Sequence, residues 1–152
     1  MATDIPRRLA AIVAADVASY TRLMELDEAG TVAAWRRART EVIEPTVAAH
    51  AGRVVKLTGD GFLAEFPAVE NAIGAALAMQ AAFGEMFAGA PADRRITFRM
   101  GVNMGDIWVD ADDIYGTGVN VAARLETLAE PGGLCISGAV HDAVKHKVAA
   151  QY

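Results

Sequence analysis

The amino-acid sequence predicts an α+β fold, an α/β sandwich built around a mostly antiparallel sheet. Segments with strand and helix patterns follow one another in the order β-α-β-β-α-β-(β)-α-β-α. Two of the strand-like segments are separated only by Gly-Asp-Gly at residues 59–61, a strong hairpin signal. The chain has 152 residues, which is enough for one ordinary domain, and no internal repeat divides it. We therefore expect a single domain over residues 1–152.

The first third of the chain predicts one buried strand and two helices. Residues 9–15 form a short apolar run that is typical of a buried strand, and the run stops at Asp16. Residues 17–24 are typical of the first turns of a helix. Over residues 27–50 apolar side chains recur at helical spacing, which predicts a longer helix. Pro45 should kink or break that helix.

The rest of the chain predicts a hairpin, a second long helix and a strand-rich second half. Gly52 is expected to cap the preceding helix, and residues 53–66 are expected to form the two hairpin strands. Pro67 opens a helix whose apolar stripe consists of Val69, Ile73, Leu77, Gln80, Phe83 and Phe87. The later segments are, in chain order, a loop at 89–95, strands at 96–102 and 107–109 with a turn at 103–106 between them, a helix at 119–128, a turn at 131–133, a strand at 134–136 and a helix at 138–148 that Ser137 caps.

Composition and charge restrict the class of protein. The formal net charge is −5 and the sequence pI is near 5.1, so a broad electrostatic contact with nucleic acid is not expected. Hydrophobic residues make up 53% of the chain and 32 of them are alanine, which predicts closely packed helices and excludes a disordered chain.

Cysteine usage and apolar runs indicate the compartment. The single cysteine, Cys135, excludes a disulfide scaffold and suits a reducing compartment. The apolar runs fall far short of the roughly 20 residues that span a bilayer, and no signal peptide is recognisable. We expect a cytoplasmic domain with no membrane insertion of its own, while attachment to a larger, membrane-bound protein stays open.

Two aspartates lie where strand-like segments end. Asp16 follows the first strand, and Asp60 lies at the tip of the hairpin. If the hairpin lies beside the first strand, both carboxylates emerge at one edge of the sheet. Carboxylate oxygens suit Mg²⁺ or Mn²⁺, which one or two carboxylates hold together with substrate phosphates. Taken singly, Asp16 is also a good helix N-cap and Asp60 an ordinary turn residue.

Lys56 is the first of four further polar candidates. It lies on the first hairpin strand, and strand alternation places it on one face with Val54 and Thr58, above the same edge as the aspartates. A lysine on a sheet is usually solvated, so Lys56 alone indicates little.

The other three candidates lie just before, or on, the helix predicted at 119–128. Asp113 precedes this helix, and Asn120 and Arg124 share one of its faces because they are spaced i and i+4. Taken alone, such a strip is a solvated face more often than a ligand site. The opposite, core-facing side is expected to consist of Val121, Leu125 and Leu128.

Together these positions resemble the catalytic domain of class III adenylyl and guanylyl cyclases. The similarity lies in the order and spacing of three segments, DVASYT at 16–21, KLTGDG at 56–61 and DIYGTGVNVAAR at 113–124. It covers nearly the whole chain, although the family usually has Phe where Tyr20 stands. The resemblance implies a ferredoxin-like βαββαβ core with a mostly antiparallel sheet and helices on one face, followed by a cyclase-type extension.

The resemblance implies two metal ions and a backbone site for the triphosphate. Asp16 and Asp60 match the pair that binds two Mg²⁺ or Mn²⁺ ions. The backbone after Asp16 would surround the triphosphate, as the free N–H groups of a helix N-terminus can do for an anion. This segment consists of Val17, Ala18, Ser19, Tyr20 and Thr21.

The resemblance also implies roles for the four other candidates. Lys56 and Asp113 match the pair that reads the purine, and Asn120 and Arg124 match the catalytic pair that orients the ribose and stabilises the transition state. A lysine ammonium and an aspartate complement the N1 acceptor and the amino donor of adenine, which favours ATP over GTP. The expected function is an adenylate cyclase that converts ATP to 3′,5′-cyclic AMP and pyrophosphate.

The family geometry implies a homodimer with shared active sites. In this family the metal pair comes from one subunit, and the residues that bind the base and ribose come from its partner, so a symmetric homodimer of this chain would contain two sites. No histidine is needed as a base. The three histidines expected on helix surfaces are His50, His141 and His146.

Three other interpretations stay open. The family normally continues with a further pair of strands that carries a triphosphate-binding lysine, so a C-terminally truncated domain of a larger polypeptide is expected here. Such a chain can be a non-catalytic dimerising or regulatory module. A guanylate cyclase fits Lys56 and Asp113 less well, and a generic metal-dependent phosphotransferase would need only Asp16 and Asp60 to converge.

Overall fold

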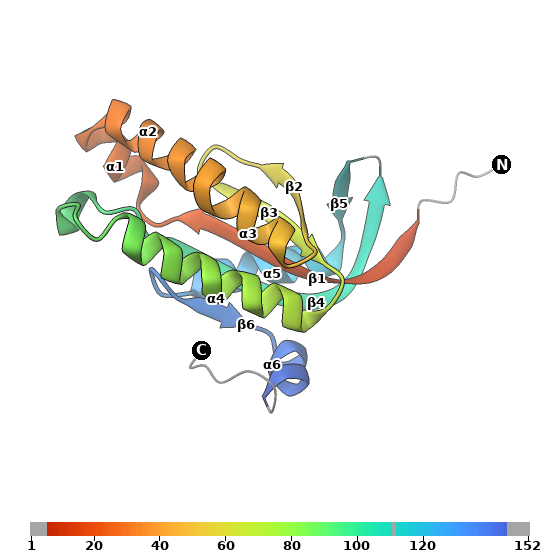
Figure 1. The fold of residues 1–152 in the computed structure, drawn as a ribbon. Helices are drawn as coiled ribbons and strands as arrows, with labels where there is room; N and C mark the ends of the chain where they lie inside the picture. The colour runs from red at the N-terminus through yellow and green to blue at the C-terminus, as the bar shows by residue number, and fades with distance from the viewer. Residues whose placement is uncertain (1–5, 111, 146–152) are drawn as a thin grey trace.

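A computed structural model describes residues 6–110 and 112–145 of the chain (Figure 1). The elements are β1 (Arg7–Val17), α1 (Tyr20–Leu26), α2 (Glu28–Ala38), the π-helical turn η1 (Arg39–Ile43), α3 (Glu44–Ala49), β2 (Arg53–Leu57), β3 (Gly61–Phe66), α4 (Val69–Met86), the 3₁₀ turn η2 (Ala92–Arg94), β4 (Phe98–Asp110), β5 (Asp113–Tyr115), α5 (Thr117–Leu128), β6 (Leu134–Ile136) and α6 (Gly138–Val144). The predicted succession is confirmed from β1 to α4 and from α5 to α6, while the strands between α4 and α5 differ from the prediction.

The strands form one six-stranded sheet in which a single pair is parallel. Neighbours follow the order β2-β3-β1-β4-β5 and are all antiparallel, while β6 pairs with β4 in parallel. The order β2-β3-β1-β4, with helices after β1 and after β3, is that of a ferredoxin-like βαββαβ core. This confirms the expected fold class, with β5, α5, β6 and α6 as the extension.

Helices lie on both faces of the sheet (Figure 1). The helices of the core, α2, α3 and α4, cover one face, and α5 of the extension covers β1 and β4 on the other. The larger apolar core includes Phe98, whose ring is stacked on Phe83 with centroids 4.2 Å apart and lies 5.7 Å from Trp35. The smaller core, on the α5 side, includes Ile12, Leu63, Ile107 and Ile114. No described helix has the length and apolar character that a membrane crossing requires.

Small residues bring α5 against the sheet. Gly118 and Ala122 are buried, and a Cβ atom at Gly101 of β4 would overlap the backbone of α5. Because the helix backbone itself contacts β4, bulkier side chains are displaced from the interface. The core-facing side predicted for this helix was therefore wrong, since Leu128 is 74% exposed and Val121 and Leu125 are only partly buried.

β4 is one long strand, where the sequence predicted two strands joined by a turn at 103–106. The turn prediction was wrong, because these residues pair continuously with residues 9–12 of β1. Asparagine and glycine, which are common in turns, are instead required here for packing of β4 against α5. The buried Asn103 side chain donates a hydrogen bond to the Gly118 carbonyl oxygen at 3.0 Å, and Gly105 leaves room for the backbone of Gly118. The short strand β5 was not predicted.

A β-bulge in β2 changes the direction of Lys56. Val54 pairs with Ala64 and Lys56 with Leu63, so Val55 is the additional residue. Val54 packs against the larger core, whereas Leu63 and Val55 belong to the smaller core on the α5 side. Lys56 therefore faces the α5 side of the sheet. The prediction that Lys56 and Val54 share a face was wrong.

The helix predicted over residues 27–50 is continuous but contains a π-helical turn. It runs as α2, η1 and α3, and η1 ends two residues before Pro45. Proline lacks an N–H and clashes with the carbonyl of residue i−4 in a regular α-helix, and the wider turn relieves both effects. The predicted break at Pro45 thus takes the form of this local widening.

Several helix ends differ from the prediction. α3 ends at Ala49 with His50 as its C-cap, and Ala51, not Gly52, adopts the left-handed conformation after it (φ 62°). Gly52 is required for another reason, since a Cβ atom there would overlap the Phe66 ring. α6 begins after Ser137 as predicted, with the Ser137 hydroxyl accepting from the Val140 N–H. Residues 146–148 of the predicted last helix lie outside the described residues.

Candidate active site

Asp16 and Asp60 lie side by side at one end of the neighbouring strands β1 and β3. Asp16 pairs with Gly61, and the Val17 N–H donates to the Asp60 carbonyl oxygen at 2.7 Å. A Cβ atom at Gly61 would overlap the carbonyl oxygen of Ala15, so glycine is what allows this close approach. Asp16 is a strand residue and not the N-cap of α1, which is Ser19.

Replacing Gly61 by alanine should therefore destabilise the fold. We expect the free energy of unfolding to fall by about 2 kcal/mol or more, because β1 and β3 must separate to accommodate the new methyl group. Gly59→Ala is the matched control, since a Cβ atom at Gly59 has nothing within 4 Å. Urea unfolding of the two variants measures the difference, and equal stabilities would contradict the close-approach argument.

Arg99 and Glu126, which sequence reasoning missed, complete the surroundings of Asp16. Arg99 lies opposite Asp16 on β4, and its guanidinium contacts both carboxylate oxygens, Nε–Oδ1 at 3.1 Å and Nη2–Oδ2 at 2.8 Å. Glu126 of α5 lies near enough to Asp16 for the two to interact electrostatically, and its Oε2 lies 3.9 Å from Arg99 Nη2. A usable signal was present for Glu126, because it continues the buried i, i+4 stripe of Gly118 and Ala122.

Two side chains around Asp16, those of Glu126 and Arg99, have shifted pKa values. Burial is the main cause that raises the pKa of Glu126 to about 7, followed by its hydrogen bond to Asp16 and the negative charge there. The hydrogen bond from Arg99 to Asp16 raises the pKa of Arg99. The protonation state of Glu126 therefore changes near neutral pH.

Glu126 should make the stability of the metal-free protein depend on pH. Its folded-state pKa of about 7 lies above the ordinary value of 4.5, so the stability that its proton contributes is complete below pH 4.5 and is lost as the pH rises through about 7. We expect Glu126→Gln to remove this loss, on the order of 1–2 kcal/mol between pH 5 and pH 8. Urea unfolding in a chelating buffer measures it, and an unchanged pH profile would contradict the assigned pKa.

The donor set at this end of the sheet fits a cation such as Mg²⁺ that keeps open positions. Asp60 has no hydrogen bond or ion pair through its carboxylate to residues 6–110 or 112–145, so both of its oxygens can ligate. The described residues contain no cluster of three or more Cys, His, Asp or Glu side chains suited to a metal ion. Two carboxylates, with substrate phosphates as further ligands, is the usual arrangement for Mg²⁺. Asp16 can also ligate the cation once at least one of its two hydrogen bonds from Arg99 is broken.

Lys56 and Asp113 are brought together. Lys56 Nζ lies 3.1 Å from Asp113 Oδ1, and both side chains are about half exposed. The bulge in β2 turns Lys56 toward β5, and the Ile114 N–H donates to Asp113 Oδ1 at 2.7 Å. The hydrogen bond from Lys56, followed by that from Ile114, lowers the pKa of Asp113. The pair therefore offers a donor and an acceptor beside each other at the surface.

Asn120 and Arg124 lie on the outer face of α5. Helical periodicity places them opposite Gly118 and Ala122, which contact the sheet, and both are exposed. Neither side chain has a hydrogen bond or ion pair within the described part of the chain. Both are therefore available to a ligand or to a second copy of the chain.

The segment 17–21 offers fewer free amides than the sequence suggested. The Val17 N–H donates to Asp60 and the Ala18 N–H donates to the Thr97 carbonyl oxygen at 2.8 Å. Ser19 adopts the left-handed conformation (φ 57°) and α1 begins only at Tyr20. The N–H groups of Ser19, Tyr20 and Thr21 have no backbone acceptor in the described residues.

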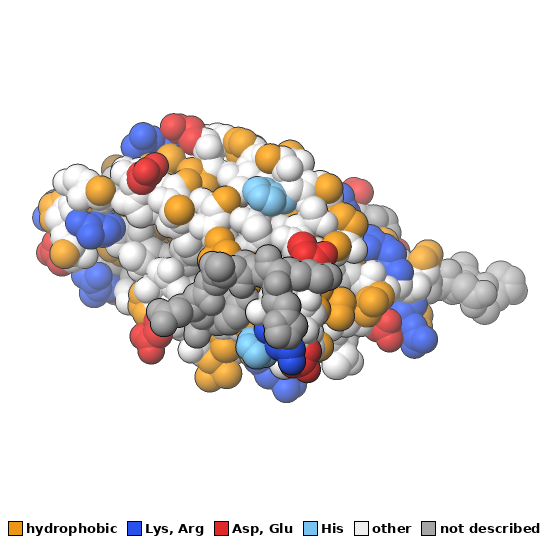
Figure 2. Space-filling model, turned by 60° about the horizontal axis from the view of Figure 1, so that its bottom comes forward, with side chains coloured by type: hydrophobic (Ala, Val, Ile, Leu, Met, Phe, Trp, Pro, Cys, Tyr) orange, Lys and Arg blue, Asp and Glu red, His pale blue; other side chains and the backbone are white. Residues whose placement is uncertain are grey.

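The described histidines lie at helix surfaces, as expected. His50 is the C-cap of α3, with Nδ1 2.9 Å from the Thr46 carbonyl oxygen, and His141 is an exposed residue of α6. Figure 2 shows histidine atoms in pale blue at the surface of the face that it presents. His146 lies outside the described residues. Neither described histidine lies on the strands that carry the aspartates.

Comparison with known proteins relates the chain to nucleotide cyclases. A family model described as the adenylate and guanylate cyclase catalytic domain matches residues 6–152. A crystal structure of an adenylate/guanylate cyclase/hydrolase from Silicibacter pomeroyi is 42% identical, with a TM-score of 0.91, and the match covers 97% of this chain and 86% of that one.

Two curated relatives carry cyclase names and are much longer than this chain. A Rhizobium meliloti (strain 1021) protein named "Putative adenylate cyclase 3" is 51% identical over 145 residues, which cover 93% of this chain and 24% of that protein. A Glutamicibacter nicotianae protein named "Adenylate cyclase" is 34% identical over 123 residues, which cover 78% of this chain and 28% of that protein. The chain thus spans about a quarter of the length of these relatives.

Proposed function

Because the chain belongs to the adenylate and guanylate cyclase catalytic domain family, we propose that it is an adenylate cyclase domain, which converts ATP to 3′,5′-cyclic AMP and pyrophosphate. The observation that carries the choice of ATP is the contact between Lys56 and Asp113, with Nζ and Oδ1 3.1 Å apart. Adenine presents N1 as an acceptor and its amino group as a donor, which this pair complements. Guanine presents the reverse pattern.

Asp16 and Asp60 are the residues that would hold two Mg²⁺ or Mn²⁺ ions. When bound there, such ions would lower the pKa of the attacking hydroxyl and neutralise the charge of the leaving pyrophosphate. The protein contributes the close approach of β1 and β3, which brings the backbones of Asp16 and Asp60 next to each other. Arg99, released from Asp16, is a cation of the right geometry to pair with phosphate oxygens at the same place.

The reaction joins the ribose 3′-oxygen to the α-phosphorus and breaks the bond from that phosphorus to the pyrophosphate oxygen, while the 3′-hydroxyl loses its proton. We assign orientation of the ribose to Asn120 and stabilisation of the negative charge on the α-phosphate oxygens to Arg124. The N–H groups of Ser19, Tyr20 and Thr21 are assigned to the phosphate chain. Cyclisation within one bound nucleotide requires only that these groups hold it in a near-attack geometry.

The active unit is proposed to be a homodimer with shared sites. Asn120 and Arg124 project from α5 away from the sheet whose end carries Asp16 and Asp60, so they can reach the aspartates of a second copy. Exposed apolar side chains offer a contact surface for that copy, and they include Leu9, Trp108 and Tyr115. Trp108 and Tyr115 are paired across β4 and β5. The domain is assigned to the cytoplasm, where ATP is available and the free Cys135 stays reduced.

The function is tested by incubating the purified domain with ATP or GTP and Mn²⁺ and measuring both cyclic nucleotides. We expect cyclic AMP from ATP and much less cyclic GTP from GTP. Nucleotide binding without product would indicate the non-catalytic module, and preferential formation of cyclic GTP would indicate a guanylate cyclase.

Exchanging the base-reading pair should change the preferred nucleotide. The double variant Lys56→Glu, Asp113→Cys offers an acceptor and a small donor where guanine needs them, so the ratio of kcat/KM for ATP to that for GTP should fall by at least about tenfold. The exposed pair Arg37→Glu, Glu41→Cys, which joins neighbouring turns of a helix, is the control. An unchanged ratio would show that these residues do not contact the base.

A further inference from the structure

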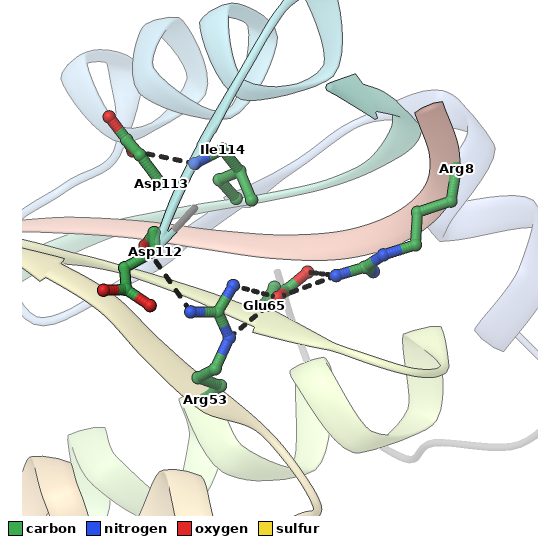
Figure 3. Close-up of polar contacts among 6 residues, drawn as sticks. All are labelled: Arg8, Arg53, Glu65, Asp112, Asp113 and Ile114. Carbon is green, nitrogen blue, oxygen red and sulfur yellow. Dashed lines mark hydrogen bonds and ion pairs between the residues drawn. The ribbon is translucent and has the colours of Figure 1, made fainter. Parts of the chain in front are cut away.

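A buried glutamate binds two arginines near Asp113, one of the two proposed base-reading residues (Figure 3). Glu65 of β3 has a side chain only 7% exposed, and it points to the α5 side of the sheet, where it pairs with Ile12 of β1. Arg8 Nη2 donates to its two oxygens at 2.9 and 2.7 Å. Arg53 donates to Oε1 from Nε at 3.0 Å and from Nη2 at 2.6 Å.

Such a buried ion cluster contributes little net free energy to the stability of the fold. Burying a carboxylate requires several charge-assisted hydrogen bonds to offset lost hydration, and an apolar side chain of similar size is often as stable. The cluster does, however, fix geometry, because two guanidinium groups around one carboxylate leave little freedom to any of the three. A fixed position is useful where a neighbouring segment carries a functional group.

Arg53 connects this cluster to that segment. Its remaining nitrogen, Nη1, points away from Glu65 and donates to the Asp112 carbonyl oxygen at 3.5 Å. Asp112 directly precedes Asp113, the first residue of the short edge strand β5. Arg53 thus bridges the sheet interior and the backbone that carries the base-reading carboxylate. Among the described residues, the Arg8 side chain hydrogen-bonds to Glu65 and to no other group.

Two short contacts connect the β5 backbone, which Arg53 holds, to the proposed purine site. The Ile114 N–H fixes the Asp113 carboxylate at 2.7 Å, and that carboxylate in turn contacts Lys56 Nζ. Lys56 is three residues from Arg53 on the same strand, across the β-bulge. The base-reading pair is therefore held from both sides, by β2 directly and by β5 through Arg53.

We propose that Glu65 and Arg53 are positioning residues for Asp113, so that this buried ion cluster sets the affinity for the adenine base. The inference rests on the proposed function, since it assigns a role relative to nucleotide binding. It gives the two arginines different roles. Both neutralise the charge of Glu65, and only Arg53 also contacts the segment that leads into β5.

The test compares Arg53→Gln with Arg8→Gln in the whole domain. Each variant removes one charged partner of the same buried carboxylate, so the two should lose similar stability in urea unfolding. Arg53→Gln should raise the KM for ATP about tenfold, with kcat changed by less than about twofold, because the base and not the reacting phosphorus is misplaced. Arg8→Gln should leave the KM within about twofold of the wild-type value.

A third variant separates positioning from simple charge neutralisation. Arg53→Lys keeps a cation for Glu65, but a single ammonium does not bridge to Asp112. It should recover most of the stability lost in Arg53→Gln and retain the raised KM. Amide hydrogen exchange of residues 112–116 provides a readout without substrate, and it should increase in both Arg53 variants and not in Arg8→Gln.

The outcomes distinguish this inference from the proposed function. Equal KM and exchange effects in Arg8→Gln and Arg53→Gln, or full recovery of both in Arg53→Lys, would overturn the positioning role. If the wild-type domain forms no cyclic AMP, the proposed function fails, and the exchange measurement then decides whether Arg53 holds β5.

Discussion

Asp60→Asn should reduce cyclic AMP formation by at least about a hundredfold while leaving the fold intact. Asparagine keeps the size of the side chain but lacks the negative charge that the proposed cations require, and a catalytic metal contributes several kcal/mol to transition-state stabilisation. The Asp60 carboxylate makes no hydrogen bond or ion pair within the described residues, so its loss should not affect stability. Asp16 is a less clean target, because its replacement would also leave Arg99 unpaired.

A matched control and a binding measurement make this result specific. Asp93 is exposed in the turn η2, and its carboxylate makes no hydrogen bond or ion pair to residues 6–110 or 112–145, while its backbone carbonyl accepts from Arg22. Asp93→Asn should therefore retain full activity. Mn²⁺ binding in the presence of a non-reactive ATP analogue should weaken in Asp60→Asn and stay unchanged in the control. Wild-type product formation by Asp60→Asn would remove the metal site from the proposal.

Local signals were sufficient to predict an α+β fold with a mostly antiparallel sheet, and the family resemblance implied the ferredoxin-like core. The Gly-Asp-Gly hairpin fixed the β2–β3 pairing, and Ser137 marked the start of α6. The aspartates could be paired without coordinates, since an antiparallel hairpin next to β1 brings Asp16 opposite Gly61. Each of these inferences needs only strand order and the nearest neighbours.

The secondary-structure predictions were wrong where a residue is required for packing against a segment that is distant in the sequence. Asn103 and Gly105 predicted a turn, but in the structure they lie where α5 packs closely against β4. Likewise Gly52 read as a helix cap, whereas its lack of a Cβ accommodates the Phe66 ring. The bulge at Val55 shifts the strand alternation by one residue, which no periodicity in a five-residue strand can reveal.

The same limit explains what was missed at the candidate site. Arg99 reaches Asp16 only because the long β4 ladder places it directly opposite, a pairing across 83 residues of sequence. Glu126 lies two residues after Arg124 but on the other side of α5, facing the sheet. Conversely, the family resemblance correctly anticipated the membership that the family match now shows. Motifs identify residues, whereas their partners depend on tertiary structure.

Mixing two inactive variants should restore activity if each site combines residues of two protomers. Asp60→Asn damages the proposed metal-binding half and Arg124→Ala the catalytic half, where losing a charge-stabilising donor costs about 10²–10³ in kcat. Random mixing makes half of the dimers heterodimers, each with one site that has both Asp60 and Arg124, so about a quarter of wild-type activity should return. Each variant mixed with itself is the control, and the recovered activity should fall on dilution as dimers dissociate. Activity that stays at the level of the single variants would place both residues in one protomer's site and exclude the shared arrangement.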